Sequence, residues 1–173
     1  MELFLELLKY VLPALAVLIV VYMMLSSFFK EEENRRMFQI RKENTKVALP
    51  LRLQAYERYT LLLERITPIN LVMRLTPGKQ NVKTYQSTLI AAIRQEYEHN
   101  VAQQIYISPE AFSLIKTAKD TTISIINQSV GQMEEGTTAE DLARRLLSLS
   151  IEKDLMPTQR AIDFLKEEVK KLF

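Results

Sequence analysis

A run of uncharged residues near the amino end constrains the fold of this chain more than any other feature. It covers residues 10–29, YVLPALAVLIVVYMMLSSFF. A helix of about 20 residues rises by about 30 Å, the thickness of the hydrocarbon layer of a membrane, and it satisfies its own backbone hydrogen bonds there. We therefore predict a single transmembrane helix that anchors the chain, with residues 1–29 forming the anchor and a short N-terminal tail.

A cleaved signal peptide is the alternative interpretation of this run. Such a peptide begins with basic residues, has a shorter apolar core and ends at a cleavage site of small residues. This chain begins with MELFLELLK, which is acidic at its start, and Ser26-Ser27-Phe28-Phe29-Lys30 is a poor cleavage site. These differences favour a retained span.

Basic residues are distributed unequally on the two sides of the run. Lys9 precedes it, whereas the following segment carries Lys30, Arg35, Arg36, Arg41, Lys42 and Lys46. Because Lys and Arg near a span stay on the cytoplasmic side, we predict a cytoplasmic C-terminal domain and an external N-terminus. Lys30, Arg35 and Arg36 are candidate contacts to anionic lipid headgroups.

Tyr22 places a hydroxyl near the middle of the predicted span. The hydroxyl either bonds within its own helix or tilts to the interface, or a partner helix supplies an acceptor. No small-xxx-small motif supports a helix dimer. Tyr22 is therefore a candidate intramembrane helix contact, with both alternatives open.

The segment 30–49 is predicted to continue the span as a helical stalk. Glu31 with Arg35, and Glu32 with Arg36, have the i,i+4 spacing that supports a helix. Its apolar side is thin, which is typical of a solvated helix rather than of a core element. Pro50 is expected to end the stalk helix.

Residues 50–173 are predicted to form a small all-α bundle, because apolar residues recur at helical spacing between clear start signals. The expected start signals are Thr67-Pro68, Asn81, Ser108-Pro109, a Thr137-to-Glu140 capping box and Met156-Pro157. The expected inward positions include Tyr59, Leu62, Leu63, Ile66, Tyr85, Leu89, Ile93, Ile115, Ile126, Leu142, Leu146, Leu149, Ile162 and Leu165. Residues 103–107 could form a short extended segment, but the sequence contains no second strand-like segment to pair with it.

Catalytic and cofactor motifs are missing from the sequence. The absence of cysteine excludes disulfides and thiolate metal sites, and the three glycines form no phosphate-binding pattern. Glu96 and His99 have the Glu-x-x-His spacing of di-iron bundles, but such a site needs a second histidine and His99 is the only one. We therefore predict no metal, no cofactor and no enzymatic activity. The alternative is an enzyme with an unrecognised carboxylate or lysine site.

Nucleic-acid binding is also not expected. Residues 30–95 contain 13 Lys and Arg against 6 Glu, whereas residues 96–173 contain 9 against 13 acidic residues. The basic excess therefore lies beside the predicted membrane rather than on one face of the domain. Contact with a ribosome or nucleic acid near the membrane remains a further alternative.

Two neighbouring pieces of sequence, Glu96-Tyr97-Glu98-His99-Asn100 and Gln103-Gln104-Ile105-Tyr106-Ile107-Ser108, resemble a family of uncharacterised single-span membrane proteins from Bacteroidota. The similarity extends from the span to about Asn127. It implies a bacterial inner-membrane location and carries over no activity, cofactor or ligand.

The same polar string is the candidate partner-docking surface, with Glu96, His99, Asn100, Gln103 and Gln104 as its residues. The alternative is a loop whose side chains cap the adjoining helices. Together these features predict a membrane-anchored scaffold or adaptor that recruits or stabilises proteins at the cytoplasmic face of the inner membrane. Its expected partners are membrane lipid and a protein partner or larger envelope complex, and it is a possible homo-oligomer.

Overall fold

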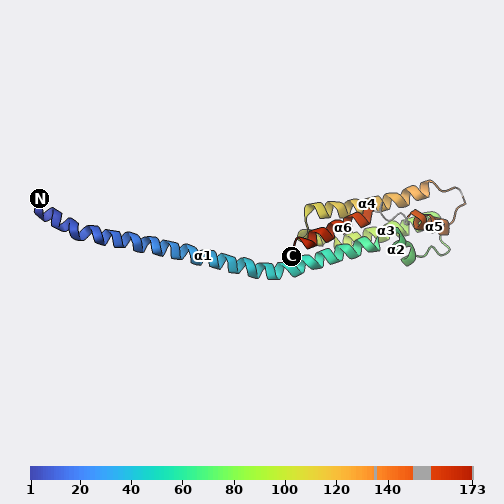
Figure 1. Ribbon diagram of the computed structural model, residues 1–173. Coiled ribbons are helices and arrows are strands. Elements are labelled where there is room, and N and C mark those ends of the chain that lie inside the picture. Colours follow the sequence, from blue (N-terminus) through green and yellow to red (C-terminus); the bar gives the residue numbers. More distant parts are fainter. Residues whose placement is uncertain (135, 150–156, 173) are drawn as a thin grey trace. The chain divides into compact units, whose positions relative to one another are not determined.

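The computed structural model describes residues 1–134, 136–149 and 157–172, with the side chains of residues 2–14 and 16 left out. This part of the chain is all helical, as predicted, and contains no strand. Figure 1 shows the elements, which are α1 (Glu2–Arg65), α2 (Pro68–Arg74), α3 (Val82–Asn100), the short 3₁₀ helix η1 (Val101–Tyr106), α4 (Pro109–Gly131), α5 (Ala139–Leu149) and α6 (Pro157–Lys170). Their contacts divide the chain into two compact units, Met1–Leu49 and Pro50–Phe173.

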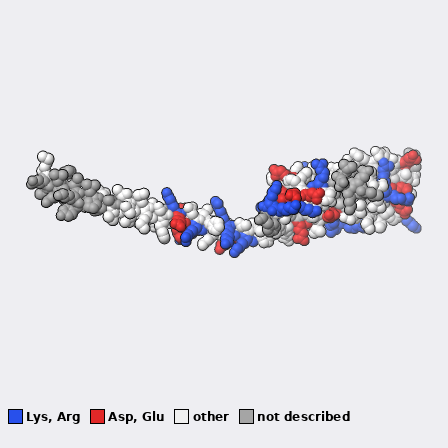
Figure 2. All heavy atoms as spheres, viewed as in Figure 1, with Lys and Arg blue, Asp and Glu red and all other residues white. Residues whose placement is uncertain are grey.

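The first unit consists of helix α1 up to Leu49. Its large apolar side chains between Val17 and Val47 are exposed, and Figure 2 shows a white stretch of uncharged residues followed by groups of charged ones. Both predicted i,i+4 ion pairs form, with Arg35 Nη2 at 3.6 Å from Glu31 Oε1 and Arg36 Nε at 3.4 Å from Glu32 Oε1. These exposed pairs support the helix by only a few tenths of a kcal/mol each, about 0.2–0.5 kcal/mol.

The described residues include no helix that combines the length and the apolar character needed to cross a membrane. The predicted span, residues 10–29, falls partly outside them, because the side chains at 10–14 and 16 are not described.

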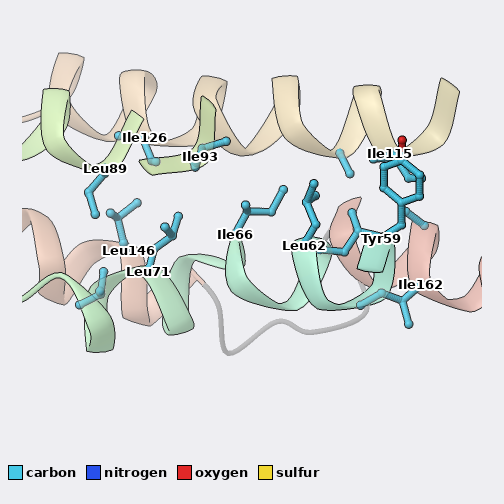
Figure 3. Close-up of a cluster of buried hydrophobic side chains, with 14 of the residues drawn as sticks. Tyr59, Leu62, Ile66, Leu71, Leu89, Ile93, Ile115, Ile126, Leu146 and Ile162 are labelled. Atoms are coloured by element: carbon cyan, nitrogen blue, oxygen red, sulfur yellow. The ribbon is translucent and has the colours of Figure 1, made fainter. Parts of the chain in front are cut away.

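The second unit is built around one apolar core to which all of its helices contribute. Figure 3 shows labelled side chains pointing into this shared interior from α1 (Tyr59, Leu62, Ile66), α2 (Leu71), α3 (Leu89, Ile93), α4 (Ile115, Ile126), α5 (Leu146) and α6 (Ile162). Helix α4 packs against α3, α5 and α6, and α5 also contacts α2 and α3. The inward positions named above are buried, except that Leu149 is 44% exposed at the end of α5, and the further positions of the same stripes, such as Ala92 and Tyr97, are half-buried.

The start signals of the helices are largely confirmed. The backbone N–H of Asn70 donates to Thr67 Oγ1 at 3.4 Å, and that of Thr84 donates to Asn81 Oδ1 at 2.8 Å. Helices α2, α4 and α6 begin at prolines, Pro68, Pro109 and Pro157, as predicted, although Met156 lies outside the described residues. Proline suits this position because its missing N–H would have no partner in the first turn.

The capping box of α5 lies one residue later than predicted. Thr138, not Thr137, caps the helix: its Oγ1 accepts from the N–H of Asp141 at 3.3 Å, and its own N–H donates to Asp141 Oδ2 at 3.0 Å. The N–H and the hydroxyl of Thr138 both donate to Asp141 Oδ2, and these two bonds hold the pKa of the Asp141 carboxyl below its usual value. Aspartate therefore takes the reciprocal role that was expected of Glu140.

Replacing the capping serine of α4 should measurably destabilise the second unit. The N–H of Ala111 donates to Ser108 Oγ at 3.0 Å, so Ser108→Ala leaves this donor without its side-chain acceptor. We expect the free energy of unfolding to fall by about 1 kcal/mol. Urea unfolding of the full chain in non-ionic detergent measures the change. Ser113→Ala, at an exposed position inside the same helix, is the control and should have no effect or a slightly stabilising one.

Pro50 does not end the stalk helix, contrary to the sequence prediction. Helix α1 continues through it to Arg65. Proline removes the hydrogen bond that its N–H would donate to the carbonyl of Lys46, and its ring crowds that carbonyl. Both residues are exposed, so water can satisfy the carbonyl. A surface proline is tolerated here because helix-forming residues continue on both sides.

The expected extended piece at residues 103–107 is also wrong. Val101–Tyr106 form the 3₁₀ helix η1, and only Ile107 is extended, with φ −113° and ψ 170°. No neighbouring strand offers hydrogen bonds in the described residues, so the backbone closes short i,i+3 bonds instead. Arg52 Nε of α1 donates to the carbonyl of Tyr106 at 3.2 Å and ties η1 to the bundle.

Candidate functional site

Three helix ends bring the charged centre of the candidate site together in the second unit. Arg65 is the last residue of α1, and Arg74 is the last residue of α2. The chain turns between these helices at Thr67, whose hydroxyl caps α2. Glu96 lies in the last turns of α3. Cations at helix C-termini are favourable because the unpaired carbonyls there carry partial negative charge.

Glu96 accepts contacts from both guanidinium groups through one oxygen. Its Oε2 lies 3.0 Å from Arg65 Nε and 3.5 Å from Arg74 Nη1. The Glu96 side chain is only 18% exposed, whereas those of Arg65 and Arg74 are 54% and 34% exposed. One carboxylate therefore neutralises one of two cations, and the cluster keeps a net positive charge.

Two surface hollows adjoin this ion pair. One, of about 390 Å³, is lined by Arg74, Leu75, Ala92 and Gln95 in addition to Arg65, Glu96 and His99. The other, of about 310 Å³, shares Arg65, Glu96 and His99 and adds Gln54, Glu57, Arg58, Leu61 and Asn100. The Arg65–Glu96 pair is thus the wall that the two hollows have in common.

The structure brings together three of the five residues predicted for partner docking. Glu96 and His99 line both hollows, and Asn100 lines one of them. Asn100 is 5% exposed, and its Nδ2 donates to the carbonyl of Glu96 at 2.8 Å, which closes the last turn of α3. Gln103 and Gln104 lie in η1 and line neither hollow.

Sequence reasoning missed the basic residues of the site. Arg58, Leu61 and Arg65 recur at spacings of three and four residues, which places them on one face of α1. This spacing was a usable signal for a shared surface on α1. Arg74 gave no local signal, because α2 approaches α3 only through the tertiary fold.

A metal site at Glu96 and His99 does not fit the geometry. Two guanidinium groups already engage the Glu96 carboxylate. No group of three or more potential metal ligands occurs within the described residues.

A larger cavity, of about 660 Å³, lies between α1 and α6 and was not predicted. Its lining combines apolar and charged side chains, among them Leu53, Tyr56, Glu57, Thr60, Asp163, Lys166 and Val169. The hydroxyl of Tyr56 donates to Glu168 Oε2 at 3.1 Å and joins the two helices. Burial raises the pKa of the Tyr56 phenol, which therefore stays protonated and able to donate.

The remaining predicted contact residues lie in the first unit. Lys30, Arg35 and Arg36 are exposed on α1. Tyr22 is 74% exposed.

Comparison with known proteins identifies a family. A family model described as a family of unknown function (DUF7935) matches residues 2–172. No curated protein and no solved structure matches.

Proposed function

The chain belongs to the DUF7935 family of unknown function, and we propose that it is a membrane-anchored helical scaffold that recruits or stabilises partner proteins. Its location is the cytoplasmic face of a bacterial inner membrane, in keeping with the resemblance of residues 96–108 to single-span proteins of Bacteroidota. The role includes no catalytic activity, no cofactor and no nucleic-acid partner. Its partners are membrane lipid and a protein or larger envelope complex, with a second copy of the chain as a further possibility.

The observation that carries this proposal is the exposure of apolar side chains around α1. Between Val17 and Phe29 the exposed fractions of the large apolar side chains range from 45% at Val21 to 74% at Tyr22. Apolar surface in water costs about 25 cal/mol per Å², so a helix that is apolar on every side favours a lipid environment. The described part of the run is shorter than a span, so the anchor is proposed from the whole uncharged sequence 10–29.

The basic residues after the run support the proposed orientation. Arg35 and Arg36 pair with Glu31 and Glu32 in α1, but these pairs are exposed. Exposed pairs are worth at most about 1 kcal/mol, so either arginine can exchange its partner for a lipid phosphate. Lys30 directly follows the run and is the nearest of the three to the headgroups.

Tyr22 is the proposed contact between helices inside the membrane. Its side chain projects from α1 with 74% exposure, so a neighbouring helix can reach the hydroxyl. Such a helix belongs either to a partner or to a second copy of this chain.

Membrane fractionation tests the anchor. The wild-type chain should stay in the membrane pellet after alkaline carbonate washing. The double variant Ile19→Arg/Val20→Arg should move largely to the soluble fraction, because each arginine at mid-span costs about 2.5–3.5 kcal/mol. Met37→Arg/Phe38→Arg, outside the run, is the matched control and should stay in the pellet. Release of the wild-type chain by carbonate would contradict the anchor.

Two further experiments test orientation and recruitment. Protease added to spheroplasts should leave residues 50–173 intact, and digestion there would overturn the cytoplasmic location. Native purification from a detergent extract should return partner proteins with the chain. Recovery of the monomer alone would count against a scaffold.

A further inference from the structure

The surface that holds the two hollows has an excess of guanidinium groups. Arg65 and Arg74 share the single carboxylate of Glu96. Arg58 is half-buried in the wall of the smaller hollow, and none of the described residues forms an ion pair with it. Glu57, its neighbour in sequence, is exposed on the same wall. The positive charge of this surface therefore exceeds the negative charge.

Apolar side chains accompany these cations in both hollows. Leu61 is 54% exposed, although it lines the smaller hollow beside Arg58 and Arg65. Leu75 and Ala92 line the larger hollow and are half-buried. Exposed arginine beside apolar side chains is a composition that protein-binding surfaces favour.

We infer that this surface, formed by Arg58, Leu61, Arg65, Arg74 and His99 around Glu96, binds an acidic segment of a partner protein that also carries an apolar side chain. The inference rests on the proposed scaffold function and names the chemistry of the partner. A carboxylate of the segment pairs with Arg58, whose planar guanidinium can donate two parallel hydrogen bonds to it. The apolar side chain covers Leu61.

The geometry favours this partner over a free anion. Glu96 already occupies the position between Arg65 and Arg74. An isolated anion would therefore have to displace a carboxylate whose side chain is only 18% exposed. Arg58 alone is open to a new carboxylate. One ion pair at a half-exposed arginine is weak, and the apolar contact at Leu61 must add to it.

Selection from a random-peptide display library tests the inference, with the full chain in non-ionic detergent as the target. We expect the enriched peptides to contain Asp or Glu near an apolar residue. A synthetic peptide of the enriched sequence should lose about tenfold or more in affinity for Arg58→Glu, because the variant replaces attraction by repulsion. It should lose less for Leu61→Ser, and binding should weaken as salt increases.

Matched controls separate this surface from general charge effects. Arg160→Glu makes the same charge change at an exposed position of α6 that lines neither hollow, and it should leave affinity unchanged. Circular dichroism checks that each variant is folded, and Arg58→Gln provides a milder change if Arg58→Glu unfolds. Enrichment of no peptide, of neutral or basic peptides, or of peptides that bind Arg58→Glu and Arg58→Gln as well as wild type would overturn the docking surface. Because the assay uses detergent, these results are independent of the carbonate test of the membrane anchor.

Discussion

Replacement of Leu62 by alanine is expected to lower the free energy of unfolding of the second unit by about 2–5 kcal/mol. Leu62 is 0% exposed and lies in the core cluster between α1 and the other helices (Figure 3). Truncation removes buried methyl groups and leaves a cavity that the surrounding helices fill only in part. This loss is a large fraction of the stability of a typical domain, about 5–15 kcal/mol.

The residue before it in the sequence is a matched control. Leu61 is 54% exposed, so Leu61→Ala makes the same chemical change at the adjacent position of α1 without opening a cavity. We expect this variant to lie within about 0.5 kcal/mol of wild type. Urea unfolding of the full chain in non-ionic detergent, followed by near-ultraviolet circular dichroism, reports on the buried tyrosines of the second unit. Equal losses for the two variants would show that Leu62 is not a core residue.

The core and the helix starts were predictable because their causes are local. Tyr59, Leu62 and Ile66 recur at helical spacing. An apolar stripe of this kind is stable in water only when it packs against the protein core. Thr67, Asn81 and Ser108 each precede a helix and carry the side-chain oxygen that its first turn lacks. Both signals can be recognised without knowing what packs against the helix.

The charged site was only partly predictable because its parts are distant in sequence. Glu96, His99 and Asn100 were suggested by a polar string within one segment. Their partners Arg65 and Arg74 come from α1 and α2, and no periodicity links these helices to α3. Local rules also failed at the capping box, where two Thr-x-x-acid patterns overlap and Thr138 with Asp141, rather than Thr137 with Glu140, forms the bonds.

Replacement of Tyr59 by phenylalanine is expected to raise the free energy of unfolding by about 1 kcal/mol at neutral pH. Tyr59 is 0% exposed, and its hydroxyl has no hydrogen-bond partner in the described part of the chain. A buried polar group without a partner costs about 1–3 kcal/mol, and phenylalanine removes the group while keeping the ring. Tyr59 contacts Phe112 edge to face, with ring centroids 6.5 Å apart, and this contact should survive.

Tyr56→Phe is the matched control with the opposite sign. Its hydroxyl is also buried but donates to Glu168 Oε2 at 3.1 Å, so the substitution removes a hydrogen bond to a carboxylate. We expect a loss of about 1 kcal/mol, less than the roughly 1.5–3 kcal/mol of a bond to a fully buried charged group, because Glu168 is partly exposed. Stabilisation by both substitutions would show that the Tyr56 bond contributes nothing.

The advantage of Tyr59→Phe should grow in alkaline solution. Burial, and to a lesser extent the phenol of Tyr97, raises the pKa of Tyr59 to about 12, whereas a tyrosine in the unfolded chain titrates near a pKa of about 10. Below pH 10 Tyr59 is protonated in both states. As the pH rises toward 12, the unfolded chain releases a proton that the folded chain retains, so the wild-type protein loses stability.

The size of this loss follows from the difference between the two pKa values. About two pH units correspond to about 2–3 kcal/mol, so the gap between Tyr59→Phe and wild type should widen by that amount between about pH 9 and pH 12. Tyr56 and Tyr85, whose pKa values burial also raises, are present in both proteins and cancel from the comparison. Urea unfolding across this pH range measures the gap. A constant gap would mean that the phenol of Tyr59 ionises equally easily in the folded and unfolded chain, and hence that α1 does not bury it.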